Sequence, residues 1–317
     1  MDAMAIQAFG GAEQLKLMHL PNPQPHDDEV QIEVHCAGVN PVDWKIREGY
    51  LKDAFPYEFP IVPGWDAAGT VSALGQNVKD FEIGDRVFAY CRKPKIQWGT
   101  YAQYVTMDAA AVAPMPKNFK FVQAAAIPLT GLTSWQALYE TAHLKTGQHV
   151  LIHGGAGGIG SLAIQLARHV GATVYTTASE HNHGYVEHLG AHHAIDYTAE
   201  SFVEAIKRLR PEGVDAVLDT IGGKVQLLSY EVIKPGGVLV SIIDPPEAEV
   251  AAKFKVRPGY VFVSPNGAQL RNIAGLIEAG AVKAPKLKEM PLKEAAAAQE
   301  QSRGRHVTGK IVLRVKK

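Results

Sequence analysis

Five glycines in the sequence GGAGGIG, residues 154–160, are the part of this chain that most clearly suggests chemistry. Gly155, Gly157 and Gly160 match the spacing G-x-G-x-x-G, between an apolar run at 150–153 and an amphipathic helical pattern. In a strand–turn–helix unit the first glycine allows a tight turn, the second lets backbone approach a pyrophosphate, and the third permits close helix–strand packing. The helix N-terminus adds free N–H groups and a partial positive charge. The spacing predicts a dinucleotide-phosphate site, with a turn that binds no ligand as the alternative.

The residues after the second expected strand bear on which dinucleotide is bound. An NAD site usually has Asp or Glu there, to bond the ribose 2′-OH. This chain has Ala178 at that position, followed by Ser179, Glu180, His181 and Asn182. Ser179, His181 and Asn182 offer small polar groups and a cation to a 2′-phosphate, whereas Glu180 lies one or two positions after the place of the acid in an NAD site. We therefore predict NADPH, and a solvated loop that caps the next helix is a compatible structural role.

Five histidines between residues 181 and 193 raise the alternative of a metal site. His188 and His192 are four residues apart, but Gly190 and the start of an expected strand interrupt any shared helix face. No cysteine or ordered carboxylate completes a ligand set of the kind that zinc requires. Structural or solvated histidines are therefore expected, and no metal.

Apolar β-type runs alternate with helical patterns after about residue 121, whereas residues 1–120 contain short β-type segments between Pro- and Gly-rich turns. Such alternation predicts a parallel sheet covered by helices on both faces. Six strands complete a dinucleotide-binding fold. They are expected at 150–153, 173–179, 192–197, 214–220, 237–243 and 260–264. A helix at 266–282 and a strand at 309–315 are expected to follow.

Composition excludes several classes of function. The 317 residues carry 32 Lys and Arg against 32 Asp and Glu, so no positive field for nucleic acid or an anionic membrane is expected. Two cysteines, Cys36 and Cys91, suit a reducing compartment. No run reaches eighteen apolar residues, and the N-terminus lacks a signal-peptide pattern. A cytoplasmic protein of two domains is expected, and a homodimer is compatible with the sequence.

Motifs along nearly the whole chain resemble one family. They are AGVNPVDWKIREG (37–49), FPIVPGWDAAGTV (59–71), GDRVFA (84–89), GTYAQYV (99–105), IPLTGLTSWQAL (127–138), the glycine turn, LGAHHAIDY (189–197), DAVLDTIGG (215–223) and GKIVLRV (309–315). The set is similar to the zinc-independent quinone oxidoreductases of the medium-chain dehydrogenase/reductase superfamily, which include zeta-crystallin-like proteins. The resemblance implies an α/β protein, with a GroES-like β-barrel catalytic domain at 1–120 and a doubly wound six-stranded Rossmann NADP-binding domain at 121–264. Residues 265–317 would return to the catalytic domain.

The sequence differs from the zinc-dependent members of the superfamily at the positions where they bind the metal. This chain has Asn40 where they carry a ligand cysteine, Trp65-Asp66 where they carry His-Glu, and no cysteine after Cys91. One carboxylate alone does not hold zinc. Without a Lewis acid to polarise a simple carbonyl, the substrate must accept hydride readily by itself, as quinones and α,β-unsaturated carbonyls do.

The resemblance implies three catalytic residues, two in the first domain and one near the boundary between the domains. Asn40 would bond the substrate oxygen near the nicotinamide, Lys45 would contact the cofactor or stabilise an enolate oxygen, and Thr130 would lie by the ribose and nicotinamide. Asn40 also suits a helix N-cap, with Pro41 at N1 and Asp43 at N3. For Lys45 a solvated side chain is the alternative.

The resemblance implies further cofactor contacts, which the spacing of the strands mostly places at their C-terminal ends, where such a sheet binds ligands. They are Gly158 and Ile159 in the turn, Ser179, Glu180, His181 and Asn182, then Tyr197, Ile242, Phe262, Val263, Ser264, Gly309 and Lys310. Trp44, Tyr50, Tyr57 and Trp65 offer a flat pocket for a planar ring, with core packing as the alternative.

The sequence thus predicts an NADPH-dependent reductase of quinones or activated alkenes, acting on a small molecule without zinc. Two alternatives stay open. One is a reductase of enoyl thioesters, which only the shape of the pocket distinguishes. The other is a non-catalytic NADPH-binding sensor or structural protein, against which the combination of Asn40, Lys45, Thr130 and the glycine turn argues.

Overall fold

The computed structural model describes residues 1–304 and 307–316, which form two compact units. The first unit contains Met1–Leu132, Ser264–Gly280 and Ala284–Lys317, and the second contains Thr133–Val263 and Ala281–Lys283. The stretch 121–132, expected in the second domain, belongs to the first unit. Its helix α2 packs on strands of that unit, and the backbone N–H of Leu129 donates to Asp66 there.

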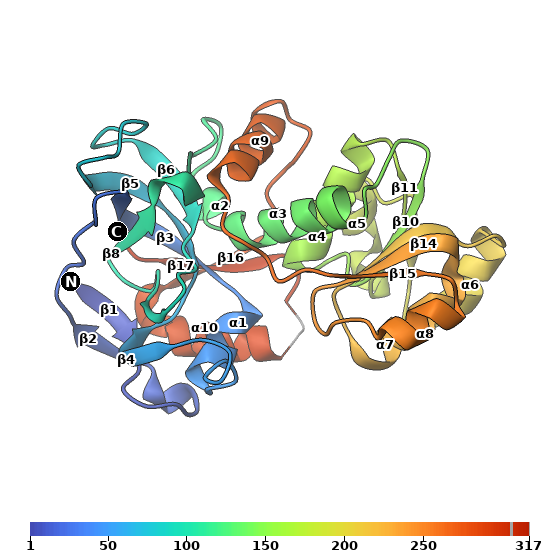
Figure 1. Cartoon of the computed structure of the whole chain (residues 1–317), viewed down its shortest axis with the longest axis horizontal. Coiled ribbons are helices and arrows are strands. Elements are labelled where there is room, and N and C mark those ends of the chain that lie inside the picture. Colours follow the sequence, from blue (N-terminus) through green and yellow to red (C-terminus); the bar gives the residue numbers. More distant parts are fainter. Residues whose placement is uncertain (305–306, 317) are drawn as a thin grey trace. The chain divides into compact units, whose positions relative to one another are not determined.

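The first unit is built on a mainly antiparallel seven-stranded sheet (Figure 1). Its path is β16-β17-β3-β5-β6-β9, with β8 also paired to β3, and β16 pairs parallel to β17. The strands are β3 (Glu29–Val39), β5 (Asp66–Leu74), β6 (Arg86–Tyr90), β8 (Tyr104–Asp108), β9 (Val112–Pro114), β16 (Leu287–Pro291) and β17 (Lys310–Arg314). The closing strand and the return of the C-terminal segment to this unit agree with the GroES-like architecture.

Two small sheets and several helices complete the first unit. The small sheets pair β1 (Asp2–Ala5) with β2 (Lys16–His19) and β4 (Tyr57–Val62) with β7 (Ile96–Trp98). The helices are α1 (Pro41–Arg47), α2 (Phe121–Ala124), α9 (Gly267–Glu278) and α10 (Ala295–Arg303), with short 3₁₀ turns at Ala12–Gln14, Ala109–Ala111 and Leu292–Glu294. Helix α3 (Pro128–Trp135) crosses the boundary between the units. The expected helix after residue 266 is confirmed as α9, and Asn266 caps it by accepting from Gln269 N.

The second unit is the predicted doubly wound sheet, and the α/β fold class is confirmed. Its six parallel strands lie in the order β12-β11-β10-β13-β14-β15, which places the reversal of strand order between β10 and β13. The strands are β10 (His149–Ile152), β11 (Thr173–Thr177), β12 (His193–Ile195), β13 (Val214–Asp219), β14 (Ile233–Ser241) and β15 (Arg257–Tyr260). The helices of this unit are α4 (Gly158–His169), α5 (His183–His188), α6 (Phe202–Leu209), α7 (Gly223–Ser229) and α8 (Ala248–Lys253). A π-helical segment at Gln136–Thr141 follows α3, and 3₁₀ turns lie at Glu180–Asn182 and Tyr230–Val232.

The last expected strand, at 260–264, is wrong in position. The strand is β15, Arg257–Tyr260, and residues 261–264 follow it as irregular backbone. The physical reason is that β14 ends at Ser241, whose carbonyl accepts from Val261 N, so nothing remains for the next residues to pair with. Pro258 is tolerated because β15 is an edge strand.

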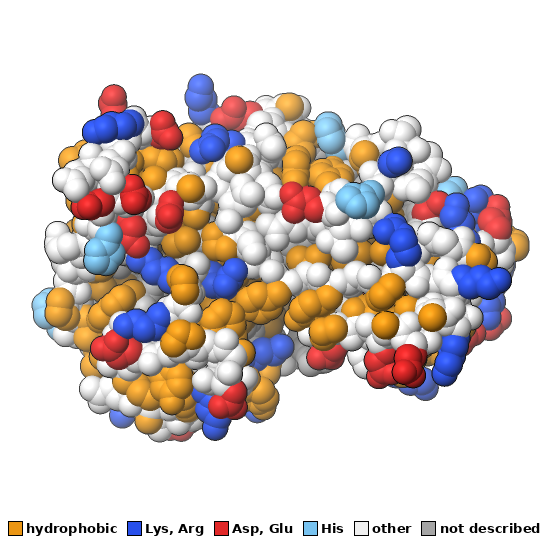
Figure 2. All heavy atoms as spheres, in the orientation of Figure 1, with side chains coloured by type: hydrophobic (Ala, Val, Ile, Leu, Met, Phe, Trp, Pro, Cys, Tyr) orange, Lys and Arg blue, Asp and Glu red, His pale blue; other side chains and the backbone are white. Residues whose placement is uncertain are grey.

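No helix among the described residues is long and apolar enough to cross a membrane. On the face shown in Figure 2, acidic and basic side chains are interspersed without a large field of one sign.

Candidate functional site

The glycine turn lies between β10 and α4 at the C-terminal edge of the parallel sheet. The backbone N–H of Gly154 donates to Thr177 Oγ1 at 3.1 Å, and that of Gly155 donates to Thr177 O at 3.0 Å. Gly154 has a φ of +65°, a conformation that favours glycine. Thr177, the last residue of β11, therefore holds two consecutive amides of the turn in place.

The three motif glycines differ in what surrounds them. A Cβ at Gly155 would lie 2.1 Å from Thr176 Oγ1, and one at Gly160 would lie 2.3 Å from Gly154 O. At Gly157, the N-cap of α4, the nearest heavy atom to such a Cβ is Gly154 O at 3.3 Å. Protein packing therefore requires the first and third glycines, while the second leaves space for a ligand. This is the cradle that a dinucleotide pyrophosphate fits.

The polar residues after β11 converge in one turn. Ala178 is buried, and the next four residues form a short 3₁₀ turn with its cap. The Nδ2 atom of Asn182 lies 3.2 Å from Ser179 Oγ and 3.0 Å from His181 Nε2. Glu180 is exposed in the same turn. The structure thus brings Ser179, His181 and Asn182 together, as a 2′-phosphate contact would require.

The other expected contacts of the second unit follow its strands. Tyr197, after β12, and Phe262, after β15, are exposed, while Val263 is buried. Ile242, directly after β14, donates its backbone N–H to Asp219 O. Ser264 is exposed and begins the return to the first unit.

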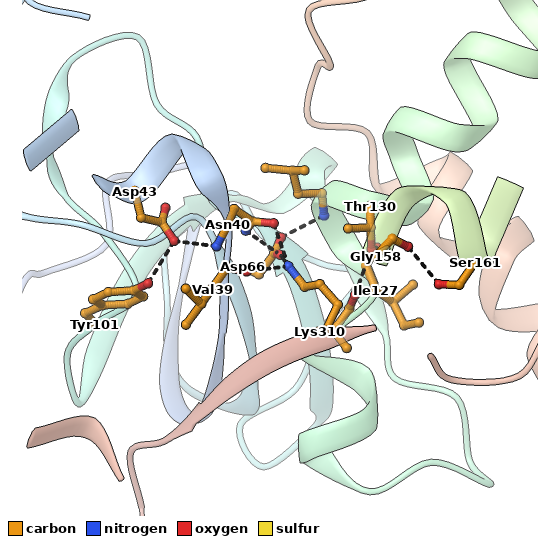
Figure 3. Close-up of polar contacts among 12 residues, drawn as sticks. Val39, Asn40, Asp43, Asp66, Tyr101, Ile127, Thr130, Gly158, Ser161 and Lys310 are labelled. Atoms are coloured by element: carbon orange, nitrogen blue, oxygen red, sulfur yellow. Dashed lines mark hydrogen bonds and ion pairs between the residues drawn. The ribbon is translucent and has the colours of Figure 1, made fainter. Parts of the chain in front are cut away.

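Asn40 is the N-cap of α1, as predicted, but its side chain does not cap the helix. The backbone N–H of Asn40 donates to Asp43 Oδ2 at 2.8 Å. Its amide Nδ2 donates to Asp66 Oδ2 at 2.8 Å, and its Oδ1 accepts from Lys310 Nζ at 2.5 Å (Figure 3). Only 1% of Asn40 is exposed. Both ends of the amide are therefore fixed, which leaves one Nδ2 hydrogen for any further partner.

Asp66 and Lys310 form a buried ion pair with Asn40 between them. Asp66 Oδ1 accepts from Leu129 N at 2.7 Å, and Asp66 Oδ2 lies 3.5 Å from Lys310 Nζ. The Lys310 ammonium also donates to Val39 O at 2.8 Å. Burial raises the pKa of Asp66 and lowers the pKa of Lys310, while each charge works against the shift of the other. Donors surround the carboxylate and acceptors surround the ammonium, an arrangement that fits the charged pair.

This donor set does not fit zinc. These residues offer the Asp66 carboxylate and the Asn40 amide oxygen as ligands, and the Lys310 ammonium already bonds both groups. A zinc ion there would lie beside an ammonium and would lack thiolate and imidazole ligands. The expectation of a metal-free site stays a prediction, which this chemistry supports.

Asp43 is the third buried ionisable group of the cluster. Its Oδ2 accepts from Asn40 N and from the Tyr101 hydroxyl, each at 2.8 Å. Its Oδ1 is buried and makes no hydrogen bond within the described chain. Burial raises the pKa of Asp43 to about 7, although the two donors and Lys310 oppose the shift. The group is therefore poised to titrate near neutral pH.

The side chains of Lys45 and Thr130 differ in burial and in hydrogen bonding. Lys45 is half-buried on α1, with Nζ 5.9 Å from the centre of the Trp44 ring, and no ion pair links it to a described carboxylate. Thr130 is buried on α3, and its hydroxyl donates to Ala126 O at 2.7 Å. Lys45 can thus offer an ammonium to a ligand, whereas the Thr130 hydroxyl hydrogen is engaged by the carbonyl of Ala126, just before α3.

Two of the expected cofactor contacts, Gly309 and Lys310, have clear structural roles. Lys310 was expected at the cofactor. In the structure its three ammonium hydrogens face Val39 O, Asn40 Oδ1 and Asp66. A contact between Lys310 and the cofactor stays a prediction. Gly309 has a φ of +74°, and a Cβ there would lie 2.0 Å from Lys286 O.

The aromatic side chains divide between core and surface. Trp65 is buried against Tyr90, whereas Tyr50 is exposed and meets Trp44 edge-on at 5.8 Å between ring centres. Tyr57 is exposed as well.

The histidines have separate partners. His192 Nδ1 accepts from Val174 N at 2.8 Å, and His188 Nε2 lies 3.3 Å from Lys283 Nζ. Within the described ranges no group of three His, Cys, Asp or Glu side chains is arranged to hold a metal.

Comparison with known proteins identifies the family. Residues 26–117 match the family model described as alcohol dehydrogenase GroES-like domain, and residues 189–313 match that described as zinc-binding dehydrogenase. The chain is 37% identical to the chloroplastic NADPH-dependent alkenal/one oxidoreductase of Arabidopsis thaliana over 324 residues, 99% of this chain and 79% of that protein. The chain belongs to the zinc-independent quinone oxidoreductase branch of the medium-chain dehydrogenase/reductase superfamily.

Solved structures of this superfamily extend the match to the whole fold. The quinone oxidoreductase from Coxiella burnetii superposes with a TM-score of 0.90 at 36% identity, covering 100% of this chain and 99% of that one. The Escherichia coli quinone oxidoreductase complexed with NADPH superposes with a TM-score of 0.88 at 26% identity, covering 99% and 100%. Membership of this superfamily makes the chain a nicotinamide-dinucleotide-binding protein, and its glycine turn fits that ligand.

Proposed function

We propose that this member of the superfamily is an enzyme that uses NADPH to reduce quinones or α,β-unsaturated carbonyls, without zinc. The observation that carries the proposal is the Asn40–Asp66–Lys310 cluster, where an ammonium bonds the two residues that replace the cysteine and the glutamate of the zinc-dependent relatives. A site of this chemistry suits an acceptor that needs no Lewis acid. The names of the Arabidopsis and Coxiella relatives agree with these two substrate classes.

The cofactor, when bound, supplies the hydride, and the chain holds both reactants. The turn residues Gly155, Gly157, Gly158, Ile159 and Gly160 would cradle the pyrophosphate, and the residues after the other strands would contact the remainder of the dinucleotide. Lys45 would face the negative charge that develops on the acceptor oxygen, assisted by the remaining Nδ2 hydrogen of Asn40. Thr130 would lie by the nicotinamide.

NADPH is proposed over NADH because no carboxylate occupies position 178. The three polar side chains that converge after β11 supply polar groups for a 2′-phosphate. The Escherichia coli quinone oxidoreductase was solved as a complex with NADPH, which agrees with this choice.

The test is steady-state oxidation of NADPH and of NADH against a panel of quinones, enones and enoyl thioesters, with and without a strong chelator. We expect turnover with quinones or enones, a preference for NADPH, and no effect of chelation. Turnover confined to enoyl thioesters would show that these, and not quinones or enones, are the substrate class. NADPH binding without turnover on any acceptor would favour a binding protein, and loss of activity on chelation that zinc restores would overturn the metal-free site.

We also propose a cytoplasmic homodimer. The buried, unpaired Cys36 and Cys91 suit a reducing compartment. Strand β15 ends the six-stranded sheet, and Tyr260 at its end and the nearby Phe262 are exposed, so this edge can pair with a second copy. Light scattering tests the mass, and a monomer at micromolar concentration would contradict the dimer.

A further inference from the structure

His153 lies between the end of β10 and the glycine turn, and only 1% of it is exposed. Its Nδ1 atom is 3.2 Å from Thr177 Oγ1 at the end of β11, and its Nε2 atom is 3.0 Å from Ser229 Oγ at the end of α7. Its backbone carbonyl accepts from Thr220 Oγ1, directly after β13, at 2.7 Å. One buried residue thus bonds three neighbouring segments at the edge of the sheet where the turn lies.

The neighbouring hydrogen bonds determine which ring nitrogen carries the proton. The Ser229 hydroxyl donates to Val225 O at 2.7 Å, so its oxygen accepts from His153 Nε2–H. The Nδ1 atom is then the acceptor and receives the Thr177 hydroxyl hydrogen. Burial lowers the pKa of His153 to about 4, partly offset by the charge of Asp219, so the ring is neutral at physiological pH.

This assignment orders a chain of hydrogen bonds that ends in the turn. Gly154 N–H donates to Thr177 Oγ1, and the Thr177 hydroxyl donates to His153 Nδ1. Because His153 accepts the hydroxyl hydrogen, the Thr177 oxygen keeps its lone pairs toward Gly154. The same threonine accepts from Gly155 N through its carbonyl oxygen.

We propose that His153 is a positioning residue that fixes Thr177 and thereby the two leading amides of the glycine turn before the dinucleotide binds. The proposal rests on the proposed role of the turn in holding NADPH. The buried ring itself is closed to the ligand, so its contribution passes through Thr177. A turn that is ordered in advance loses less conformational entropy on binding, which strengthens affinity without a new contact.

Four variants test the proposal. His153→Phe keeps a ring and removes both polar contacts, and Thr177→Val removes the hydroxyl at nearly constant shape. His153→Asn retains an acceptor close to the position of Nδ1. Ser229→Ala is the matched control, because it removes the hydrogen bond on the side of the ring away from the turn and leaves Nδ1 as the acceptor for the Thr177 hydroxyl, whose oxygen already accepts from Gly154 N.

The first measurement is the dissociation constant of NADPH by fluorescence titration, with each fold checked by thermal unfolding. We expect His153→Phe and Thr177→Val each to weaken NADPH binding about tenfold. The double variant that combines these two changes should bind NADPH no more weakly than Thr177→Val alone. His153→Asn should stay within about threefold of the parent, and Ser229→Ala should bind as the parent does. The loss should appear in KM for NADPH, with kcat at saturating NADPH nearly unchanged.

The second measurement is hydrogen exchange of the Gly154 and Gly155 amides in the ligand-free protein. Exchange should accelerate in His153→Phe and Thr177→Val and stay at the parent rate in Ser229→Ala. If the parent fails to bind NADPH, the proposed function fails, while exchange still decides the role of His153. Parent-like exchange and affinity in His153→Phe, or additive losses in the double variant, would overturn the proposal. If His153→Phe does not fold, Thr177→Val and His153→Asn decide it by the same criteria.

Discussion

Gly157 separates the ligand-binding role of the glycine turn from its packing role. A Cβ at Gly157 meets one atom within 4 Å, Gly154 O at 3.3 Å, and the backbone there, at φ −77° and ψ 176°, suits alanine. We therefore expect Gly157→Ala to change the free energy of unfolding by less than about 1 kcal/mol. The added methyl group would occupy the space through which a pyrophosphate approaches, so the affinity for NADPH should fall at least about tenfold, or about 1.4 kcal/mol.

Gly160→Ala is the matched control for this prediction. A Cβ at Gly160 would lie 2.3 Å from Gly154 O and 2.7 Å from Gly155 Cα, so the backbone must move. We expect a loss of stability of about 1–3 kcal/mol. Urea unfolding measures stability, and fluorescence titration measures the NADPH dissociation constant. If Gly157→Ala folds as the parent does and also binds NADPH equally well, the turn does not hold the pyrophosphate in the proposed way.

Three further perturbations address the cofactor, the reaction and the buried acid. Ala178→Asp should shift preference toward NADH, because its carboxylate repels a 2′-phosphate and can bond a 2′-OH. If the ratio of the NADPH and NADH dissociation constants is unchanged, the residues after β11 do not bind the 2′-phosphate. Lys45→Met should lower turnover by up to ~10²–10³ while the protein stays folded, since a donor to the acceptor oxygen acts most strongly in the transition state. A change confined to NADPH binding would assign Lys45 to the cofactor instead. Asp43 has its pKa raised to about 7 in the folded chain, against 3.8 as the ordinary value. The stability that its protonated form contributes is therefore present at low pH and is lost as the pH rises through 7. Relative to Asp43→Asn, the parent should lose about 3 kcal/mol of unfolding free energy between pH 5 and pH 8. Parallel stability–pH curves for the two proteins would show that Asp43 is ionised throughout.

Local sequence patterns were sufficient to predict the second unit and the start of α1, whereas the GroES-like architecture of the first unit came from the family resemblance. The glycine spacing after an apolar run predicts the turn between β10 and α4, and the alternation of strands and helices predicts the six-stranded parallel sheet. Asn40, Pro41 and Asp43 predict the start of α1. These features depend on periodicity and on backbone preferences over a few residues, which a single sequence displays directly. The misplaced strand at 260–264 shows the limit, because Val261 is apolar and β-type but β14 has already ended beside it.

The partners of the polar groups were decided only by the tertiary structure. Asn40 meets Asp66, 26 residues away, and Lys310, 270 residues away, so the side chain that suits a helix cap is held by a buried ion pair instead. His153 meets Ser229 across 76 residues and Thr177 across 24, and the two contacts together determine its tautomer. Composition and spacing carry no signal for such pairs, because strand register and helix packing bring the atoms together. Burial then strengthens each of these polar contacts by removing water, and that is a property of the fold rather than of any segment.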